Sequence, residues 1–222
     1  MSNQSKLTHY NLDELDRQNA TINILYSERS AGKSYQVKHK KGVLKYLETG
    51  RRFILMRRFK EEIRSDLIEQ YFTDVDVHKI TDGKYNCITV FKKALWLSYY
   101  DPETGKTTRG EKIGYVVALS TEQNYAGGSY LDVDDIIFEE FMSRSEYLAN
   151  EPDKLMNFRS TVDRKRNAVR LWLVGNTISR INPYIHEWGL QKIVSQQKQG
   201  TIESVELPTG TYDNNGNENN NS

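Results

Sequence analysis

The sequence has a single cysteine, almost no net charge and no long apolar run in its 222 residues. Cys87 has no partner for an internal disulfide, so nothing in the chain requires an oxidising compartment. The longest apolar runs, such as Phe53 to Met56 and Leu171 to Val174, are far shorter than the roughly 18 residues that a membrane helix needs. The first residues also lack the apolar segment of a secretory signal. We therefore expect an intracellular protein without a membrane span.

Charge is balanced overall but uneven along the chain. Thirty-one Lys and Arg against 30 Asp and Glu give +1, which excludes both a globally basic nucleic-acid coat and an acidic solvating chain. Any polyanionic partner must then be met by local charge. Residues 33–64 hold eleven basic and three acidic residues, 132–153 eight acidic and one basic, and 154–170 six basic and one acidic. We interpret these blocks as a phosphate-facing region, a metal-facing region and an interface; solvated helix faces are the alternative.

The first part of the chain alternates strand and helix patterns. Thr21 to Tyr26 is rich in β-forming residues and is followed by a loop of small residues. The segment from Lys33 to Glu48 then has helical spacing and ends at Gly50. The apolar run Phe53 to Met56 predicts a second strand, and Ile63 to Tyr71 predicts the helix that follows it.

Five further strands and one helix complete the expected fold. Three predicted strands with a turn at residues 101–105 indicate a β-hairpin insertion: Lys84 to Val90, Leu95 to Tyr99 and Tyr115 to Leu119. Two buried strands, Ile136 to Phe138 and Val169 to Val174, flank a helix over Pro152 to Arg164. This order predicts an α/β fold with a doubly wound, mainly parallel sheet. With 37% hydrophobic residues, we expect one domain over residues 1–207. An Asn-rich disordered tail or linker over 208–222 completes the chain.

A phosphate-binding loop is predicted between the first strand and the first helix. Gly32, Lys33 and Ser34 match the end of the P-loop pattern, whereas Ser27 stands where its first glycine is expected. A triphosphate needs converging amide hydrogens, a lysine for its outer oxygens and a hydroxyl for Mg²⁺. We therefore expect ATP and Mg²⁺ to bind here, at the residues Ser27, Arg29, Ser30, Ala31, Gly32, Lys33, Ser34 and Tyr35.

Two carboxylates follow the buried strand Ile136 to Phe138. P-loop ATPases use this arrangement to hold hydrated Mg²⁺ and to orient the attacking water. We assign Glu139, together with Ser34, to the metal and Glu140 to the water. Carboxylates that merely leave the sheet for solvent are the alternative.

Polar residues also follow the last strand and flank the preceding helix. Asn176 ends an apolar strand, and its uncharged amide suits a γ-phosphate sensor or, alternatively, an Asx turn. Four arginines near the helix over 152–164 are candidates for a residue that reaches a neighbour's γ-phosphate, or for ion pairs with the acidic block. They are Arg159, Arg164, Arg166 and Arg170.

Taken together, these segments and their order resemble the DNA-packaging ATPases of phi29-type tailed phages over about Ile22 to Ile185. The segments that carry the resemblance are residues 30–35, 53–60 with the Arg57-Arg58 pair, 136–141, 161–166 and Asn182-Pro183-Tyr184. The resemblance implies an additional-strand P-loop ATPase whose hydrolysis of ATP drives double-stranded DNA into a procapsid. It also implies a second, nuclease-like domain after this one, so that the chain is a truncation at the linker.

The resemblance also implies individual roles. Lys33 and Ser34 match the Walker A lysine and hydroxyl, Arg29 matches a P-loop arginine, and Glu140 matches the catalytic glutamate. Asn176 matches the polar sensor, and Arg164 the finger that acts in trans. The implied partners are double-stranded DNA, the phage portal and procapsid, a packaging RNA as a further candidate, and copies of the chain in a homo-oligomeric ring, a pentamer in this family. The implied location of a phage-encoded motor is the host cytoplasm.

Two other functions are compatible with the residues. A nucleotide-dependent switch or assembly module with little hydrolysis is conceivable because Ser27 and Glu139 depart from the usual P-loop ATPase pattern. A small-molecule kinase would need clustered arginines in an acceptor-binding lid, for which Arg57-Arg58 is the obvious candidate. Steady-state phosphate release and stimulation by DNA distinguish the three.

Overall fold

The computed structural model describes residues 12–27, 32–125, 127–143, 146–176, 182–198 and 200–206. The predicted residues Arg29, Ser30 and Ala31, and the tail over 208–222, lie outside this part. Among the described residues, no helix has the length and apolar character to cross a membrane.

A seven-stranded sheet forms the centre of the molecule, in the order β1-β7-β6-β2-β5-β4-β3. Five neighbouring strands pair in parallel, and β3 and β4 pair antiparallel at one edge. The strands are β1 (Ile22–Ser27), β2 (Arg52–Arg57), β3 (Cys87–Phe91), β4 (Ala94–Asp101), β5 (Lys106–Ala118), β6 (Val133–Glu139) and β7 (Arg170–Asn176). The predicted α/β fold with a mainly parallel sheet is confirmed.

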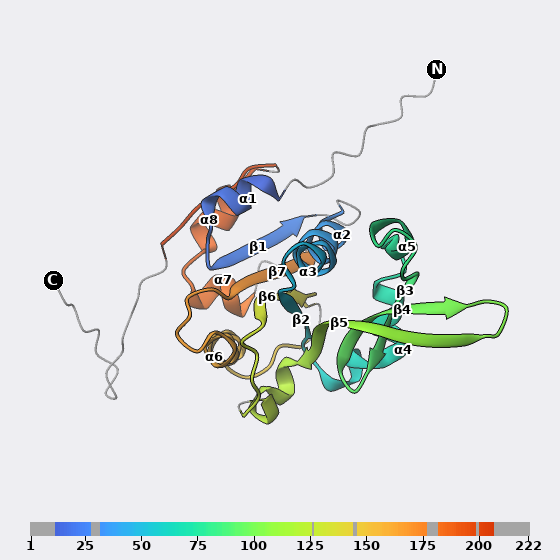
Figure 1. The fold of residues 1–222 in the computed structure, drawn as a ribbon. Coiled ribbons are helices and arrows are strands. Elements are labelled where there is room, and N and C mark those ends of the chain that lie inside the picture. Colours follow the sequence, from blue (N-terminus) through green and yellow to red (C-terminus); the bar gives the residue numbers. More distant parts are fainter. Residues whose placement is uncertain are drawn as a thin grey trace, which may run out of the picture.

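Helices cover both faces of this sheet (Figure 1). Their bounds are α1 (Asp13–Gln18), α2 (Lys33–Gln36), η1 (Val37–Leu44), α3 (Lys45–Thr49), η2 (Lys60–Ile63), α4 (Ser65–Tyr71), α5 (Val77–Ile80), η3 (Leu119–Tyr125), α6 (Glu151–Asp163), α7 (Pro183–Glu187) and α8 (Gln191–Gln196). The segments α2, η1 and α3 run on as one helical rod with π-helical hydrogen bonding in the middle, and Gly50 ends the rod in the left-handed conformation at φ 71°. The sequence predicted both its start and its end.

Alternating residues of the central strands divide the core between the two faces. On one face, Phe53 and Leu55 of β2 pack with Val37 and Val43 of η1 and with residues of α4. On the other, Ile54 and Met56 of the same strand pack with α6 and α7 residues. Both faces of β2 are buried, which is why its sequence reads as a continuous apolar run.

The predicted hairpin continues the same sheet. The buried end of β5 pairs in parallel with β2, from Phe53 opposite Gly114 to Arg57 opposite Ala118. The other end of β5 pairs with β4, and this two-stranded ribbon extends sideways beyond the helices (Figure 1). The sheet therefore has a parallel half covered by helices and an antiparallel half whose far end projects as a ribbon.

Candidate nucleotide site at the carboxyl ends of the parallel strands

Four parallel strands end at one edge of the sheet and bring most of the predicted site residues together. Ser27 at the end of β1 lies opposite Asn176 at the end of β7, and Glu139 at the end of β6 lies opposite Val174. Arg57 ends β2 beside them. Ligands of open α/β sheets bind outside the carboxyl ends of the strands. The half-buried Asn176 is therefore placed at the edge where a sensor is expected.

Lys33 begins α2 directly after Gly32, whose φ of 70° is a left-handed value that favours glycine. The Lys33 ammonium is buried, and its Nζ donates a hydrogen bond to the Ser27 hydroxyl at 2.7 Å. Burial lowers the pKa of this ammonium, while the nearby Glu139 carboxylate raises it in part. Ser27 lies in extended backbone at the strand end, so the position of the missing glycine imposes no left-handed strain here.

Glu139, at the end of β6, accepts hydrogen bonds from two helices, α2 and α4. The Ser34 hydroxyl donates to Oε2 of Glu139 at 3.1 Å, and the Tyr71 hydroxyl donates to Oε1 at 2.5 Å. Burial raises the pKa of the Glu139 carboxyl, and both hydrogen bonds oppose that rise. Burial also raises the pKa of Tyr71 far above its usual value, so its hydroxyl stays protonated and donates.

The donor set suits Mg²⁺ held jointly with a nucleotide. A hydroxyl and a carboxylate 3.1 Å apart match the hard oxygen ligands of Mg²⁺, which usually takes one or two protein groups and completes its shell with phosphate oxygens and water. The described residues contain no cluster of three or more His, Cys, Asp or Glu that would cage a metal without a nucleotide. Ser34 and Glu139 therefore fit the metal role assigned to them.

Glu140 differs from Glu139 in backbone, exposure and partner. Its φ of 55° is left-handed, which is strained for a residue with a side chain, and its carboxylate is 60% exposed. The Arg57 guanidinium donates to Oε2 of Glu140 at 2.7 Å and to Glu62 at 3.0 Å. The exposed glutamate thus turns away from the sheet and is paired with an arginine.

A buried arginine holds the backbone around Glu140. Arg58 donates to the carbonyl oxygens of Glu140 at 3.1 Å and Phe141 at 2.6 Å. It also forms a two-point ion pair with the buried Glu151, at 2.7 and 2.9 Å. Tyr184 donates to the same carboxylate at 2.8 Å, which gives the Asn182-Pro183-Tyr184 segment an architectural role.

Arg58, Glu151 and Tyr71 were not assigned to the site from the sequence. The Arg57-Arg58 doublet after an apolar strand is the one available signal, and its sequence is equally compatible with the lid of a kinase. Its two guanidinium groups instead pair with Glu62, Glu140 and Glu151 of the same chain. Tyr71 appeared only as an apolar position of α4. Lys38 contacts it from η1, donating to its carbonyl and lying 4.2 Å from its ring centroid.

Tyr35, predicted to contact the nucleotide, lies partly buried in α2. Its ring stacks on His39 with 5.1 Å between centroids and also packs against the core.

The four arginines after the acidic block lie toward the other end of the sheet. Arg164 ends α6 at a φ of 46°, is exposed, and donates to the carbonyl of Gly128 at 2.7 Å. Arg166 is held by Asp134 and by several carbonyls before and within β6, including that of Val133 at 2.7 Å. Arg159 donates a hydrogen bond to the carbonyl of Val169. Arg170 donates to the side-chain oxygen of Asn19 and forms an ion pair with Asp16. Within one chain, Arg164 is thus separated from Glu139 and Glu140 by the length of the strands.

The basic block over 33–64 is mostly neutralised inside the chain. Nine of its eleven cations have a carboxylate within 4 Å: Lys38, Lys40, Lys41, Lys45, Arg51, Arg52, Arg57, Arg58 and Arg64. The interpretation of this block as a phosphate-facing surface is therefore wrong for these nine side chains. The reason is that acidic residues far along the chain, such as Asp132 to Asp135, fold against it.

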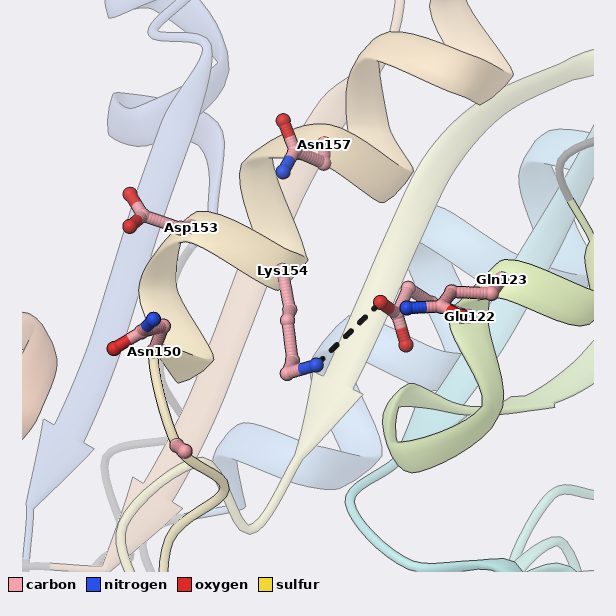
Figure 2. A pocket seen from close by; sticks show the side chains of 7 residues that line it. Glu122, Gln123, Asn150, Asp153, Lys154 and Asn157 are labelled. Carbon is pink, nitrogen blue, oxygen red and sulfur yellow. Dashed lines mark ion pairs between the residues drawn. The ribbon is translucent and has the colours of Figure 1, made fainter.

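Two cavities help to delimit the site. One of about 380 Å³ opens between the end of β2 and α4, and its lining includes Arg57, Tyr71 and Glu139. The other, of about 420 Å³, lies between η3 and α6, where Lys154 reaches toward Glu122 at 3.7 Å (Figure 2). This second cavity shares no lining residue with the predicted nucleotide site. The first is the one that adjoins the carboxylates.

Comparison with known proteins gives a consistent set of relatives. A family model described as podovirus DNA encapsidation protein (Gp16) matches residues 4–208. The DNA packaging protein of Bacillus phage B103 is 32% identical over 177 residues, which are 76% of this chain and 48% of the relative. The chain thus spans about half the length of this relative.

Two solved structures extend the likeness to the fold. The N-terminal domain of the DNA packaging ATPase from bacteriophage phi29 superposes with a TM-score of 0.69 at 26% identity, covering 90% of this chain and 96% of that one. A chain of the phi29 viral genome packaging motor assembly superposes with a TM-score of 0.64 at 27% identity, covering 82% of this chain and 51% of that one.

Proposed function

The chain belongs to the podovirus DNA encapsidation protein family, and on this premise we propose that it is an ATP-hydrolysing motor domain that drives double-stranded viral DNA into a procapsid. The observation that carries the proposal is the Ser34–Glu139 hydrogen bond of 3.1 Å. It joins the predicted Walker A hydroxyl to the predicted metal-side carboxylate across 105 residues of sequence. The similarity to the phi29 packaging ATPase domain supports the same function.

Each site residue has a separate task in this proposal. The Lys33 ammonium and the amide hydrogens at the start of α2 bind the phosphate oxygens of ATP. Ser34 and Glu139 hold Mg²⁺, which supplies charge neutralisation at the transferred phosphoryl group. Tyr71 fixes one oxygen of Glu139, so the other faces Ser34. Asn176 senses the γ-phosphate from the neighbouring strand end.

Glu140 orients the attacking water and accepts its proton. Arg57 holds one oxygen of this carboxylate, and release of the pair would free the side chain to turn toward the attacking water. Arg58 and Glu151 fix the backbone on which the carboxylate turns. Release from Arg57 is therefore a point at which hydrolysis is controlled.

Arg164 acts in trans in a homo-oligomeric ring. It is exposed at the end of α6, remote from its own chain's site, and bonds only a carbonyl among the described groups. An arginine that reaches a neighbour's γ-phosphate is worth on the order of 10³ to 10⁵ in rate. Likeness to a chain of a packaging motor assembly supports a multimer that works with DNA, and we extend this to a portal and procapsid partner.

The alternative, a nucleotide-dependent switch with little hydrolysis, is favoured by one observation. The Arg57–Glu140 ion pair at 2.7 Å keeps the proposed water-orienting group engaged. A protein in which the pair never opened would bind ATP without turnover.

Steady-state phosphate release, measured with and without duplex DNA over a range of protein concentrations, tests the proposal. For a motor, the turnover rate per protein molecule rises with protein concentration, because each site needs a neighbour's arginine. Duplex DNA raises this rate further. Bound ATP without phosphate release at any concentration would favour the switch. Stimulation by small phosphate acceptors instead of DNA would favour a kinase.

A further inference from the structure

Four of the cations without a carboxylate partner in the described part of the chain gather on the antiparallel half of the sheet. Nine cations of the 33–64 block are paired with carboxylates, but no carboxylate of the described residues lies within 4 Å of Lys92, Lys93, Arg109 or Lys112. Lys92 and Lys93 form the turn between β3 and β4, and the other two lie on β5.

The strand register places these β5 cations on one face. Trp96 lies opposite Thr89 and Lys112, and Ser98 lies opposite Cys87 and Arg109. Because residues two apart on a strand share a face, Trp96 and Ser98 point the same way. Arg109 and Lys112 therefore lie on this face, and so does Phe91, two residues after Thr89, whose ring lies next to both Lys92 and Arg109. We call this face, with Lys92, Lys93, Arg109 and Lys112, the outer basic face.

The reverse side of the same strands faces the hydrophobic core. Ile88, Leu95, Leu97 and Ile113 point to it and belong to the core cluster that includes α4. By contrast, β3 and β4 contribute no described residue to the core cluster on the other side of the sheet. Within the described residues, no helix buries the outer basic face in a hydrophobic core.

Aromatic rings hold these cations in place without neutralising them. The Arg109 guanidinium carbon lies 4.0 Å from the centroid of Phe91, and Nζ of Lys92 lies 5.4 Å from the same centroid. Nζ of Lys112 lies 4.2 Å from the Tyr115 centroid. A ring quadrupole attracts a cation but carries no net charge, so the face keeps its full positive charge.

The Lys92-Lys93 turn is unusual for its residues. Phe91 pairs with Ala94, so the two lysines form a two-residue hairpin loop, and their φ values are 49° and 58°. Such turns favour Asn-Gly, because a side chain disfavours positive φ. Lysine is therefore not the residue that the turn geometry favours at either position, and the two positive charges are the property that these side chains add.

Nearby carboxylates are engaged elsewhere. Glu111 accepts hydrogen bonds from Lys84, Tyr85 and Tyr46. The Asp101 carboxylate accepts hydrogen bonds from the backbone amide of Glu103 and from the Thr104 hydroxyl, within its own turn. The outer basic face is thus a cationic surface with no acidic counterpart among these groups.

We propose that the outer basic face binds the phosphodiester backbone of duplex DNA. The proposal rests on the proposed packaging function for its choice of polyanion and adds the place of contact. Lys92, Lys93 and Arg109 are exposed and Lys112 is half-buried, so a phosphodiester backbone can approach this face from solvent. A few lysine and arginine contacts suffice, because each releases counterions from the DNA.

The variant Lys92→Asn/Lys93→Gly tests the effect of charge without destabilising the fold, since it removes two positive charges and relieves the backbone strain of the turn. We expect an unchanged or higher melting temperature. Duplex DNA affinity, measured by fluorescence anisotropy between about 50 and 200 mM salt, falls roughly 10- to 100-fold at 50 mM. The slope of log affinity against log salt becomes shallower by about 1.8 for two lost contacts. Arg109→Gln/Lys112→Gln gives a similar loss.

The matched control is Lys192→Gln/Lys198→Gln, which makes the same change in net charge on exposed residues elsewhere and leaves the salt slope unchanged. Equal losses in control and turn variant overturn the proposal, as do unaltered DNA binding by the turn variant or no duplex binding by the unmodified chain at 50 mM. A drop in self-association without loss of DNA binding identifies a subunit contact instead. ATP hydrolysis without DNA, measured on the same samples, tests the proposed function separately, because these lysines lie outside the nucleotide site.

Discussion

Arg58 donates a hydrogen bond to the main-chain carbonyl of Glu140 at 3.1 Å while its guanidinium pairs with the buried Glu151. One buried side chain thus connects the end of β2, the left-handed residue after β6 and the start of α6. The neighbouring Arg57 contacts the Glu140 carboxylate itself. The two arginines of the doublet therefore act on the same glutamate in different ways, one on its backbone and one on its charge.

Removing Arg58 and Glu151 together tests the backbone role. Arg58→Met alone leaves a buried charge unpaired, which costs about 3 to 5 kcal/mol. Arg58→Met/Glu151→Leu/Tyr184→Phe replaces the pair, and the tyrosine hydroxyl that donates to Glu151, by apolar groups and is expected to fold. We expect this triple variant to bind ATP normally but to turn over roughly 10- to 100-fold more slowly, because Glu140 is no longer fixed.

The control for this prediction is Arg52→Met/Asp132→Leu, which removes an ion pair at the opposite ends of the strands. If the Arg58/Glu151/Tyr184 triple variant melts near the unmodified protein and hydrolyses ATP at its full rate, the Arg58 contact is structural only.

Lys33→Ala is expected to abolish ATP binding. The buried ammonium lies at the start of α2, where we propose that it binds the outer phosphates, and alanine removes it. The control is Lys40→Ala, which should bind ATP normally. Lys40 lies on the same helical rod as Lys33, is partly exposed and pairs with Asp13 of α1. Calorimetric titration of both variants is the measurement, and micromolar affinity retained by Lys33→Ala would remove the P-loop assignment.

Tyr71→Phe is expected to weaken the coupling between Mg²⁺ and ATP binding. The variant keeps the ring against Lys38 and Phe72 but removes the hydrogen bond on Glu139, and a bond to a charged group is worth about 1.5 to 3 kcal/mol. The Mg²⁺ concentration for half-maximal ATP binding should rise by about tenfold or more.

Tyr46→Phe removes a tyrosine hydroxyl that donates to Glu111, away from the site, and serves as the control. Equal Mg²⁺ dependence in the two variants would reduce Tyr71 to a packing residue of α4.

Arg164 is expected to act across subunits. Arg164→Ala subunits retain an intact nucleotide site, and Glu140→Gln subunits retain an intact arginine, so a mixture of the two inactive variants should recover hydrolysis at hybrid interfaces. Arg166→Ala is expected to lower the melting temperature instead, because Arg166 holds Asp134 and carbonyls of the β6 region. An inactive mixture of variants that both assemble would return Arg164 to a surface role.

The sequence predicted the parts of the site that depend on local order along the chain. A strand, a glycine loop and a helix placed Lys33 and Ser34, and an apolar strand ending in two carboxylates placed Glu139 and Glu140. Parallel pairing then brought the two segments together, because carboxyl ends of parallel strands share one edge.

Contacts made through the packing of distant segments were not predictable in the same way. Tyr71 reaches Glu139 only because α4 packs beside β2, and its sequence signal was that of an ordinary apolar position. The basic block of residues 33–64 was overestimated for a related reason. Its partners, such as Asp132, Asp134 and Asp135, are remote in sequence and adjacent only in the fold.

The most direct test of ATP hydrolysis at this site is a paired measurement of nucleotide affinity and phosphate release on Glu140→Gln. The amide preserves the shape of the side chain but cannot accept the proton of water, so we predict unchanged ATP affinity with turnover reduced by roughly 10² to 10⁴. Glu139→Gln, measured beside it, should instead impair Mg²⁺-dependent binding, because its carboxylate faces Ser34. Full turnover by Glu140→Gln, with hydrolysis lost only in Glu139→Gln, would contradict the assignment and exchange the roles of the two carboxylates.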